Sequence, residues 1–321
     1  MKFSCVIPCY NAARWLPETL ESIAKQTYPV HDIVVTDDGS TDNSVSILEA
    51  AREGGLPIQI LKGGGLGPAG ARNLAIERCT GDWVAFLDAD DWWRPDHLQR
   101  IYDLVSTTDD VVFLAAAEHF SINVNRIVSR SDAPFQEPKS GMTHFKYWEL
   151  YKEHGILELS SMAVQRSRLV DAGGFDPEMR GAEDLELMMR MVVDRTWSYD
   201  PTPSSVYRCN NPESHSRKGT TNADCLVANL RTLIKLQKEY HIDPGEIRGS
   251  ARTVMSKMIT DVEPSDRPWV KGLAWPYLSK KQKAIFKMAI AVPWAYAGLN
   301  RLRQKLKGNQ YRPRQVVPPT S

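Results

Sequence analysis

Short apolar runs alternate with amphipathic segments over the first 115 residues of the chain. The apolar runs have the length and the β-branched or aromatic content of strands, and they lie at 3–7, 33–36, 58–61, 83–87 and 111–114. The segments between them predict helices at 13–26, 42–52, 68–78 and 95–105. Because strands that alternate with helices at this spacing form parallel sheets, the pattern predicts an α/β fold, with a mostly parallel central sheet and helices on both faces.

The alternation ends near residue 115. Further helices are predicted at 143–153, 182–195 and 222–258. Prolines mark loops in the middle region, at Pro134, Pro138, Pro201, Pro203 and Pro212. The change of pattern divides the chain into residues 1–115, residues 116–220 and a helical C-terminal region, 221–321.

The composition is that of a globular protein. Of the 321 residues, 42% are hydrophobic and 25% are charged, so the chain can bury a core and is neither a disordered segment nor a small disulfide scaffold. No apolar run reaches the roughly 18 residues of a membrane span, and the first residues do not form a signal peptide. The five cysteines include no Cys-x-x-Cys pair, which favours a reducing, cytoplasmic location.

The C-terminal end is strongly basic. Residues 280–321 hold ten lysines and arginines and no acid, which leaves −9 on residues 1–279 because the whole chain carries +1. The apolar stretch 284–299 contains Trp294 and Tyr296 and is too short to span a bilayer. Two interpretations stay open: 284–307 lies on an anionic membrane at its cytoplasmic face, or this helix docks on the protein. No RNA-binding motif is present, so nucleic acid is not an expected partner.

Polar residues follow directly after each of the first four predicted strands. These four segments are 8–11, 37–42, 62–70 and 88–91. Open α/β sheets bind ligands at the carboxyl ends of their strands. The aromatic, acidic, glycine-rich and again acidic groups at these ends therefore predict a nucleotide and metal site.

The segment after the fourth strand holds a candidate metal ligand. Asp88 and Asp90, spaced i, i+2 at a strand end, can share a hard divalent cation and leave coordination sites for diphosphate oxygens and water. The alternative is a polar turn in which Asp91 caps a helix that begins near Pro95.

The segment after the second strand is also acidic. The Asp38 carboxylate could accept a hydrogen bond from a base imide N–H or a ribose hydroxyl. The alternative for the residues after it is capping of the next helix by Ser40 or Thr41, with Asp42 near its positive N-terminus.

The glycine-rich segment matches G-x-G-x-x-G at residues 65–70, which keeps an NAD-binding oxidoreductase as an alternative. Against that alternative, the segment follows the third strand rather than the first, and Pro68 removes a backbone N–H that would face a phosphate. Arg72, just inside the following helix, is a candidate diphosphate contact; the other interpretation is a solvated arginine.

Glu183 and Asp184 open the predicted helix 182–195. Acids in a first turn commonly interact with the helix dipole. This helix is amphipathic, so packing anchors it, and a carboxylate held at a pocket edge can act as a general base. The segment from Tyr207 and Arg208 to His215 is predicted to be a loop that could close over a diphosphate; an exposed His215 is the alternative.

Taken in chain order, these segments resemble the large second family of glycosyltransferases, which has the GT-A fold. The resemblance rests on CVIPCYN at 5–11, IVVTDDGSTD at 33–42, GPAGARN at 67–73, GDWVAFLDADD at 81–91, and GFD at 174–176 followed by Glu183-Asp184. It covers about residues 1–215, and the remaining residues are not diagnostic.

On the donor side, the resemblance implies roles residue by residue. Pro8 would shape the first loop, and Tyr10 and Asp38 would hold the nucleotide base. Arg72 would lie near the base or the diphosphate.

For the metal and the chemistry, the resemblance implies three further roles. Asp88 would contact the ribose or the metal shell, and Asp90 would bind Mg2+ or Mn2+. Asp184 would be the general base that takes the proton of an acceptor hydroxyl. Residues 1–115 would form the nucleotide-sugar-binding half of the domain, and residues 116–220 the acceptor-binding half.

The implied activity is the inverting, metal-dependent transfer of one sugar from a nucleotide-diphosphate sugar to a hydroxyl. The commonest donor nucleotide is UDP, with GDP and dTDP left open, and the acceptor would be a saccharide or a lipid-linked molecule of cell-surface polysaccharide or glycolipid biosynthesis. The Gln-x-x-Arg-Trp motif of processive synthases is absent, so one sugar is expected per encounter. The alternatives are a non-catalytic sugar-nucleotide-binding scaffold and a sugar nucleotidylyltransferase, whose glycine- and lysine-bearing first loop is missing here.

Overall fold

A computed structural model describes residues 1–130, 135–142, 158–177, 179, 183–209, 230, 232, 234, 274–280, 282–284 and 287. The chain divides into two compact units. The first consists of Met1–Glu178, Glu183–Pro212 and Arg314–Ser321, and the second of Met179–Ala182 and Glu213–Pro313. All candidate site residues named above, apart from His215, lie in the first unit, and His215 lies outside the described residues.

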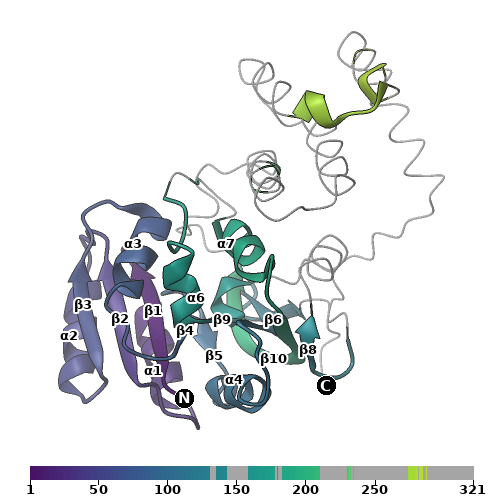
Figure 1. The fold of residues 1–321 in the computed structure, drawn as a ribbon. Coiled ribbons are helices and arrows are strands. Elements are labelled where there is room, and N and C mark those ends of the chain that lie inside the picture. Colours follow the sequence, from purple (N-terminus) through teal and green to yellow (C-terminus); the bar gives the residue numbers. More distant parts are fainter. Residues whose placement is uncertain are drawn as a thin grey trace. The chain divides into compact units, whose positions relative to one another are not determined.

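A single sheet organises the described part of the first unit (Figure 1). Its first half consists of four parallel neighbours, in the order β3 (Ile58–Lys62), β2 (Asp32–Asp37), β1 (Phe3–Cys9) and β4 (Trp83–Phe86). All four were predicted from their apolar runs. Because these strands are parallel, the segments that follow them meet at one edge of the sheet.

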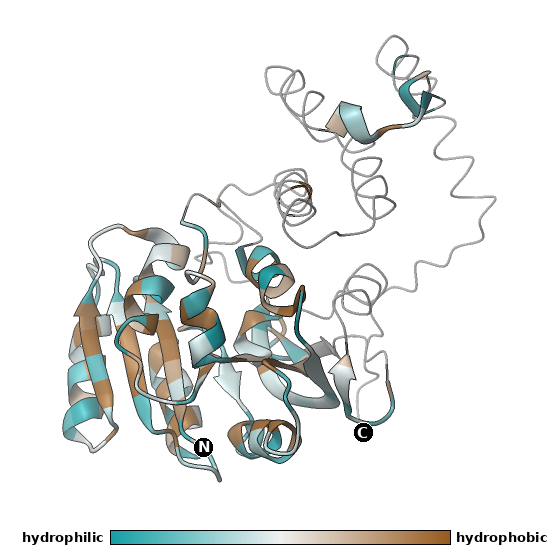
Figure 2. Ribbon diagram, in the orientation of Figure 1, coloured by the Kyte–Doolittle hydropathy of each residue, from teal (hydrophilic) through white to brown (hydrophobic). Residues whose placement is uncertain are grey.

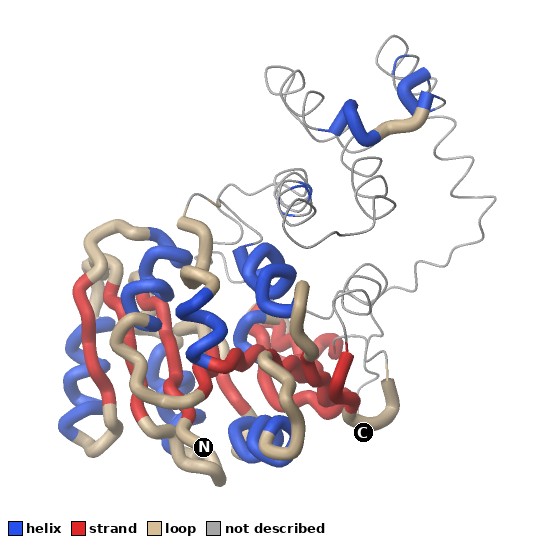
Figure 3. The backbone as a smooth tube through the Cα atoms, in the orientation of Figure 1, coloured by secondary structure: helices blue, strands red, loops and turns tan. Residues whose placement is uncertain are grey.

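The second half of the sheet mixes strand directions. Beyond β4 come β9 (Met162–Gln165), β6 (Val112–Ser121), β10 (Trp197–Cys209) and β5 (Trp92–Trp93). β9 and β5 run against the other strands along this path, whereas β6 and β10 are parallel to each other. Two strands lie off the path: β7 (Arg126–Arg130) pairs with β6, and β8 (Lys139–Met142) with β10. The prediction of a mostly parallel sheet is confirmed, and Figure 3 shows its strands as one red layer.

Helices cover both faces of this sheet, as predicted. The main core lies under α1 (Leu16–Ala24), α2 (Ser44–Glu53) and α4 (His97–Val105), which pack on alternate residues of the strands such as Phe3, Cys5 and Ile7 of β1. The central strands are accordingly the hydrophobic part of Figure 2.

A second set of helices brings site residues to the sheet. It comprises α3 (Gly67–Ile76), α6 (Arg166–Asp171) and α7 (Glu183–Val192). α3 packs on β1 and β2, and α6 packs on β9. Phe86 of β4 meets Phe175, between α6 and α7, edge to face at 5.4 Å between ring centroids. This contact holds the segment after α6 against the sheet.

Strand β10 corrects the interpretation of two prolines. Pro201 and Pro203 were expected to mark a loop, but both lie within this strand. The pairing of β10 with β6 shifts register between Asp200 and Ser205, and such an irregularity accommodates residues that cannot donate a ladder hydrogen bond.

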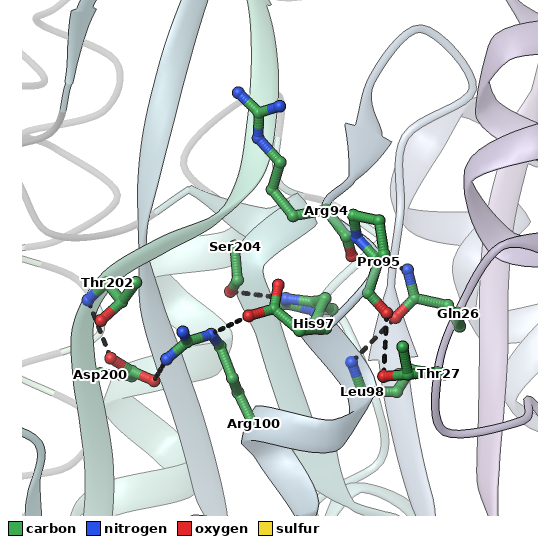
Figure 4. A network of polar contacts seen from close by, with 11 residues as sticks. Gln26, Thr27, Arg94, Pro95, His97, Leu98, Arg100, Asp200, Thr202 and Ser204 are labelled. Atoms are coloured by element: carbon green, nitrogen blue, oxygen red, sulfur yellow. Dashed lines mark hydrogen bonds and ion pairs between the residues drawn. The ribbon is translucent and has the colours of Figure 1, made fainter.

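The polar network of Figure 4 holds this irregular part of β10 against α4. Ser204 Oγ lies 2.8 Å from Nδ1 of the buried His97, and Arg100 donates to Asp200 at 3.0 Å. Burial lowers the pKa of His97 to about 3, so the imidazole is neutral at physiological pH. The network is a packing feature of the fold.

Several predictions fall on residues outside the described part, namely the helix at 143–153, most of the helix at 222–258 and nearly all of the stretch 284–307. The short 3-10 helix η3 (Trp275–Tyr277) lies within the predicted helical C-terminal region. Among the described residues, no helix is long and apolar enough to cross a bilayer.

Candidate active site

The acidic loop after β4 is held from several sides. The hydroxyl of Thr19, on α1, lies 3.0 Å from the carbonyl oxygen of Ala89 and 2.8 Å from that of Asp91. The buried Asp91 carboxylate accepts the hydroxyl of Ser160 at 2.6 Å and the backbone N–H of Arg208 at 2.8 Å. Asp91 therefore ties the loop to β10 and to η1 (Leu159–Ser161), and the alternative that it caps a helix is wrong. Burial, with the charges of Asp90 and Asp88, raises the pKa of Asp91 well above its usual value.

Asp88 and Asp90 are the half-buried members of this loop. The N–H of Asp88 donates to Ser160 Oγ at 3.1 Å, and the carbonyl of Asp90 accepts the Arg208 Nε–H at 2.7 Å. Carboxylate oxygens of this kind are ligands that Mg2+ and Mn2+ prefer. Within the described ranges, no three His, Cys, Asp or Glu side chains gather to hold an ion. Two carboxylates supply only part of the octahedral oxygen coordination that Mg2+ takes, so further ligands would have to complete it.

Arg72 connects the acidic loop to α7. Its guanidinium donates to Asp88 at 2.6 Å and to Glu183 at 3.2 Å, and it lies 5.5 Å from the ring centroid of Phe175. The residue is only 4% exposed, so the interpretation as a solvated arginine is wrong. Although burial opposes the charge, Asp88 and Glu183 raise the pKa of Arg72 and keep it protonated. Its Nε is buried and has no hydrogen-bond partner among the described residues.

Asn73, the next residue of α3, fixes the segment that leads to α7. Its side-chain amide donates to the carbonyl of Phe175 and accepts the N–H of the same residue, both at 2.8 Å. Gly174 has a positive φ of 68°, and an added Cβ there would overlap Asn73 Oδ1. A glycine is required at this position because the backbone passes directly against the amide.

We expect Gly174→Ala to destabilise the protein by about 2–3 kcal/mol, because it combines a positive φ with this overlap. The neighbouring Gly173→Ala is the matched control, since φ is 78° there and an added Cβ meets nothing within 4 Å. This variant should lower the free energy of unfolding by only about 1–2 kcal/mol, because the positive φ is its sole source of strain. Urea unfolding measures both variants, and equal losses would contradict the role of the Asn73 contact.

Asp184 lies in the first turn of α7, beside Glu183. Its Oδ1 accepts the N–H of Leu185 at 2.7 Å. Burial and the charge of Glu183 raise the pKa of Asp184 to about 7, with Glu158 adding to the rise and Arg72 opposing it. A carboxylate with this pKa is half deprotonated at neutral pH, which is the condition that favours a general base.

Asp38 organises the glycine-rich loop between β3 and α3. Its Oδ1 accepts the N–H groups of Gly65 and Leu66 at 2.8 and 2.7 Å, and its Oδ2 accepts that of Gly67 at 2.8 Å. The G-x-G-x-x-G segment thus directs its N–H groups at a protein carboxylate, which is not the arrangement that an NAD pyrophosphate requires. Since a carboxylate has about four acceptor positions, Asp38 keeps capacity for one more donor.

The first two loops are joined next to Asp38. The N–H of Asp38 donates to the carbonyl of Cys9 at 2.8 Å, which brings Asp38 beside the half-buried Pro8 and the 61%-exposed Tyr10. The Asn11 N–H donates to Ser40 Oγ at 2.9 Å.

The rest of the second loop binds the first loop, and Asp42 also accepts the N–H of Ser44, the first residue of α2, at 3.0 Å. Thr41 donates its N–H to Asn11 at 2.8 Å, and Asp42 accepts the N–H of Ala13 at 2.9 Å. Helix α2 has no side-chain cap, so the expectation that Ser40 or Thr41 caps it is wrong.

His119 and Glu158 lie near the site and were not predicted from the sequence, and Tyr207 was predicted there only as part of a loop. His119 of β6 and Tyr207 of β10 are cross-strand neighbours with ring centroids 5.8 Å apart, and His119 Nε2 lies 2.9 Å from Glu158 Oε1. Burial and the charge of Glu158, followed by those of the acidic loop, raise the pKa of Tyr207. Tyr207 and Arg208 lie in β10, so the prediction of a loop at these two residues is wrong.

The sheet order and the acidic loops at the ends of β2 and β4 define the GT-A fold. The chain belongs to glycosyl transferase family 2, whose family model matches residues 4–173. Among solved structures, residues 1–349 of TarS from Staphylococcus aureus, in complex with UDP-GlcNAc, superpose with a TM-score of 0.71. That match is 19% identical and covers 97% of this chain and 93% of the other. The mannosyltransferase PcManGT of Pyrobaculum calidifontis, in complex with GDP-Man and Mn2+, gives a TM-score of 0.58 at 18% identity, over 97% and 81% of the two chains.

Sequence relatives support the same family. The amylovoran biosynthesis glycosyltransferase AmsB of Erwinia amylovora is 41% identical over 197 residues, which are 59% of this chain and 64% of that protein. The poly(ribitol-phosphate) β-N-acetylglucosaminyltransferase TarS of S. aureus is 37% identical over 199 residues, 60% of this chain and 33% of that protein. An uncharacterised glycosyltransferase of Nostoc is 42% identical over 112 residues, 35% of either chain. The match thus spans between about a third and two thirds of these relatives.

Proposed function

We propose that the protein transfers a single sugar from a nucleotide-diphosphate sugar to an acceptor hydroxyl, with inversion at the anomeric carbon. The observation that carries this proposal is the chain of contacts from Asp88 through Arg72 to Glu183 and its neighbour Asp184. It joins the acidic loop, where a diphosphate would lie, to a carboxyl whose pKa of about 7 suits a general base. A leaving group and a base are both needed for single displacement at a sugar.

On the donor side, Tyr10 and Asp38 would contact the nucleotide base, with Pro8 shaping the first loop. The exposure of Tyr10 and the remaining acceptor capacity of Asp38 support these roles. Arg72 would lie near the base or the diphosphate, where its positive charge would favour binding of the donor.

At the acidic loop, Asp90 would hold Mg2+ or Mn2+, and Asp88 would contact the ribose or the metal shell. When bound, the ion would stabilise the negative charge that develops on the diphosphate. Asp184 would take the proton of the acceptor hydroxyl, because a neutral hydroxyl is a weak nucleophile. On this proposal, residues 1–115 form the donor half of the domain and residues 116–220 the acceptor half.

UDP is the proposed donor nucleotide, because the TarS structure with this fold holds UDP-GlcNAc. The acceptor is proposed to be a saccharide or lipid-linked molecule of cell-surface polysaccharide or glycolipid biosynthesis. The names of AmsB and TarS, which refer to amylovoran biosynthesis and poly(ribitol-phosphate), support this class.

A nucleotide panel tests the donor proposal. Melting temperatures are measured with UDP, GDP, dTDP, CMP and NAD, each with and without Mn2+, because a ligand that binds only the native state raises the melting temperature. UDP should give the largest rise, and Mn2+ should increase it. A rise with NAD and none with the other nucleotides would contradict the proposal.

The rate of donor cleavage should increase with pH and level off above about 7, because Asp184 must be deprotonated to act as a base. The negative charge of Glu183 raises the pKa of Asp184, so in Glu183→Gln the rise of the rate with pH should occur at lower pH. Initial rates from about pH 5 to about pH 9 measure both effects. A rise at the same pH in Glu183→Gln, or at a higher pH, would contradict the assignment of Asp184 as the titrating group.

We also propose that the basic stretch 284–307 holds the enzyme on the cytoplasmic face of a membrane, close to a lipid-linked acceptor. The support is sequence alone: an apolar aromatic segment followed at once by Arg301, Arg303, Lys305 and Lys307. The full chain should sediment with vesicles that contain anionic lipid, and replacing these four residues by glutamine should abolish sedimentation. Equal sedimentation of both proteins would contradict the proposal.

A further inference from the structure

Arg208 of β10 binds the acidic loop after β4 from the face of the sheet that carries Trp15. Successive residues of a strand point to opposite faces. Tyr207 lies beside His119 and Glu158, whereas Arg208 packs on the aromatic rings of the α1 face. Arg208 therefore lies on the α1 face of the sheet, and its Nε–H donates to the carbonyl of Asp90.

Three aromatic rings and two hydrogen-bond acceptors surround the guanidinium of Arg208. Its guanidinium carbon lies 4.4 Å from the ring centroid of Trp15, 4.6 Å from that of Trp92 and 5.6 Å from that of Phe120. One nitrogen donates to Glu18 at 2.6 Å, while Nε donates to Asp90 at 2.7 Å. The side chain is 4% exposed, so the rings and these two acceptors together compensate its desolvation.

The planar guanidinium of Arg208 fixes the relative directions of its hydrogen bonds. Arginine offers N–H donors in a rigid fork, so a group bound through one edge has its other donors fixed in space. Glu18 and the rings orient the fork, and the fork then sets the position of the Asp90 carbonyl. At the same residue, the backbone N–H of Arg208 binds the Asp91 carboxylate. The two residues that flank the Asp90–Asp91 peptide bond are thus both held by Arg208.

We propose that Arg208 is a positioning residue that fixes Asp90 in the conformation that receives the divalent cation. This inference rests on the proposed metal-dependent donor binding and adds to it a residue outside the substrate contacts. When the backbone of a metal-binding carboxylate can move, binding of the cation must first order that backbone. The free-energy cost of this ordering lowers the affinity for the cation. The nucleotide contacts proposed for Tyr10, Asp38 and Arg72 do not depend on the position of Arg208.

The test compares metal affinity with nucleotide affinity in Arg208→Met and Arg208→Lys. Methionine keeps contact with the aromatic rings and loses both hydrogen bonds. Lysine keeps the charge and the rings but cannot reach Glu18 and Asp90 as a fork. Arg100→Met is the matched control, because Arg100 also makes two ion pairs, with Asp96 and Asp200, in the network of Figure 4 and touches no residue of the acidic loop. Circular dichroism and ligand-free melting temperatures establish that each variant is folded.

UDP binding is measured by calorimetry without metal, and the Mn2+ concentration that gives half of the metal-dependent stabilisation is then measured at saturating UDP. Arg208→Met should raise that Mn2+ concentration about tenfold, the size of one lost hydrogen bond to a charged group, and leave the metal-free UDP affinity within about twofold. Arg208→Lys should fall between wild type and Arg208→Met, and Arg100→Met should match wild type in both quantities.

Two results would overturn the inference. One is an unchanged Mn2+ requirement in folded Arg208→Met. The other is a loss of metal-free UDP affinity equal to the loss of Mn2+ affinity, since general damage to the site would explain both. Wild-type protein that binds UDP without any response to Mn2+ would instead refute the proposed metal dependence, and this inference with it.

Discussion

Asp184→Asn should lower the turnover number by about two to four orders of magnitude while leaving donor binding close to that of wild type. The asparagine amide has the size of the carboxylate and cannot accept the acceptor proton. Steady-state rates at saturating donor, with UDP affinity measured on the same preparation, separate the two quantities. A selective fall in turnover is the expected result for a residue that acts only in the chemical step.

Asp194→Asn provides the matched control. Asp194 follows α7 and forms an exposed ion pair with Arg168, so its replacement removes a carboxylate near the same helix without reaching the site. Its turnover should equal that of wild type. Turnover of Asp184→Asn within about tenfold of wild type would contradict its role as the base.

Asp90→Ala should abolish the effect of Mn2+ on nucleotide binding and lower turnover by about two to three orders of magnitude. The physical reason is that diphosphate departure concentrates negative charge near the acidic loop, where Asp90 would hold the cation. Metal-free UDP affinity should persist, because Tyr10, Asp38 and Arg72 remain. Titration of Mn2+ against turnover, and against UDP-dependent stabilisation, measures both effects.

Asp96→Ala is the comparison for this variant. Asp96 precedes α4 and pairs with Arg100, and its side chain is 46% exposed. Its loss should leave the Mn2+ dependence unchanged. If Asp90→Ala retained the wild-type Mn2+ response, the metal would be held elsewhere and the account of the acidic loop would be wrong.

The first half of the sheet was predictable because its signals are local. β1 to β4 are short, buried apolar runs, and the polar segments after them are contiguous in the sequence. The second half gave weaker signals. β9 has only four residues. β10 contains Pro201 and Pro203 at a register shift, and because proline usually interrupts a strand, a loop was predicted where the structure has this strand.

Candidate site residues could be predicted only where they stand in a short, recognisable sequence motif. Asp88, Asp90 and Asp184 stand in recognisable segments, but the contact of Arg72 with Glu183 joins residues 111 positions apart. The same limit applies to Ser160 and Arg208, whose contacts with Asp91 span 69 and 117 positions. One signal was present: Thr19 interrupts the apolar face of α1 formed by Leu16, Leu20 and Ile23, and a polar residue at such a position needs a buried partner.

The fate of a donor incubated with the full chain and Mg2+ tests directly whether the protein transfers sugar by single displacement. UDP-GlcNAc, whose sugar is joined to the phosphate in the α configuration, is followed by NMR in the absence of acceptor, so that water takes the acceptor position. The account predicts slow release of UDP, with the free sugar appearing first as the β anomer, and no release by Asp184→Asn. Tight binding of UDP-GlcNAc without cleavage would instead identify a non-catalytic binder, and initial release of the α anomer would contradict single displacement.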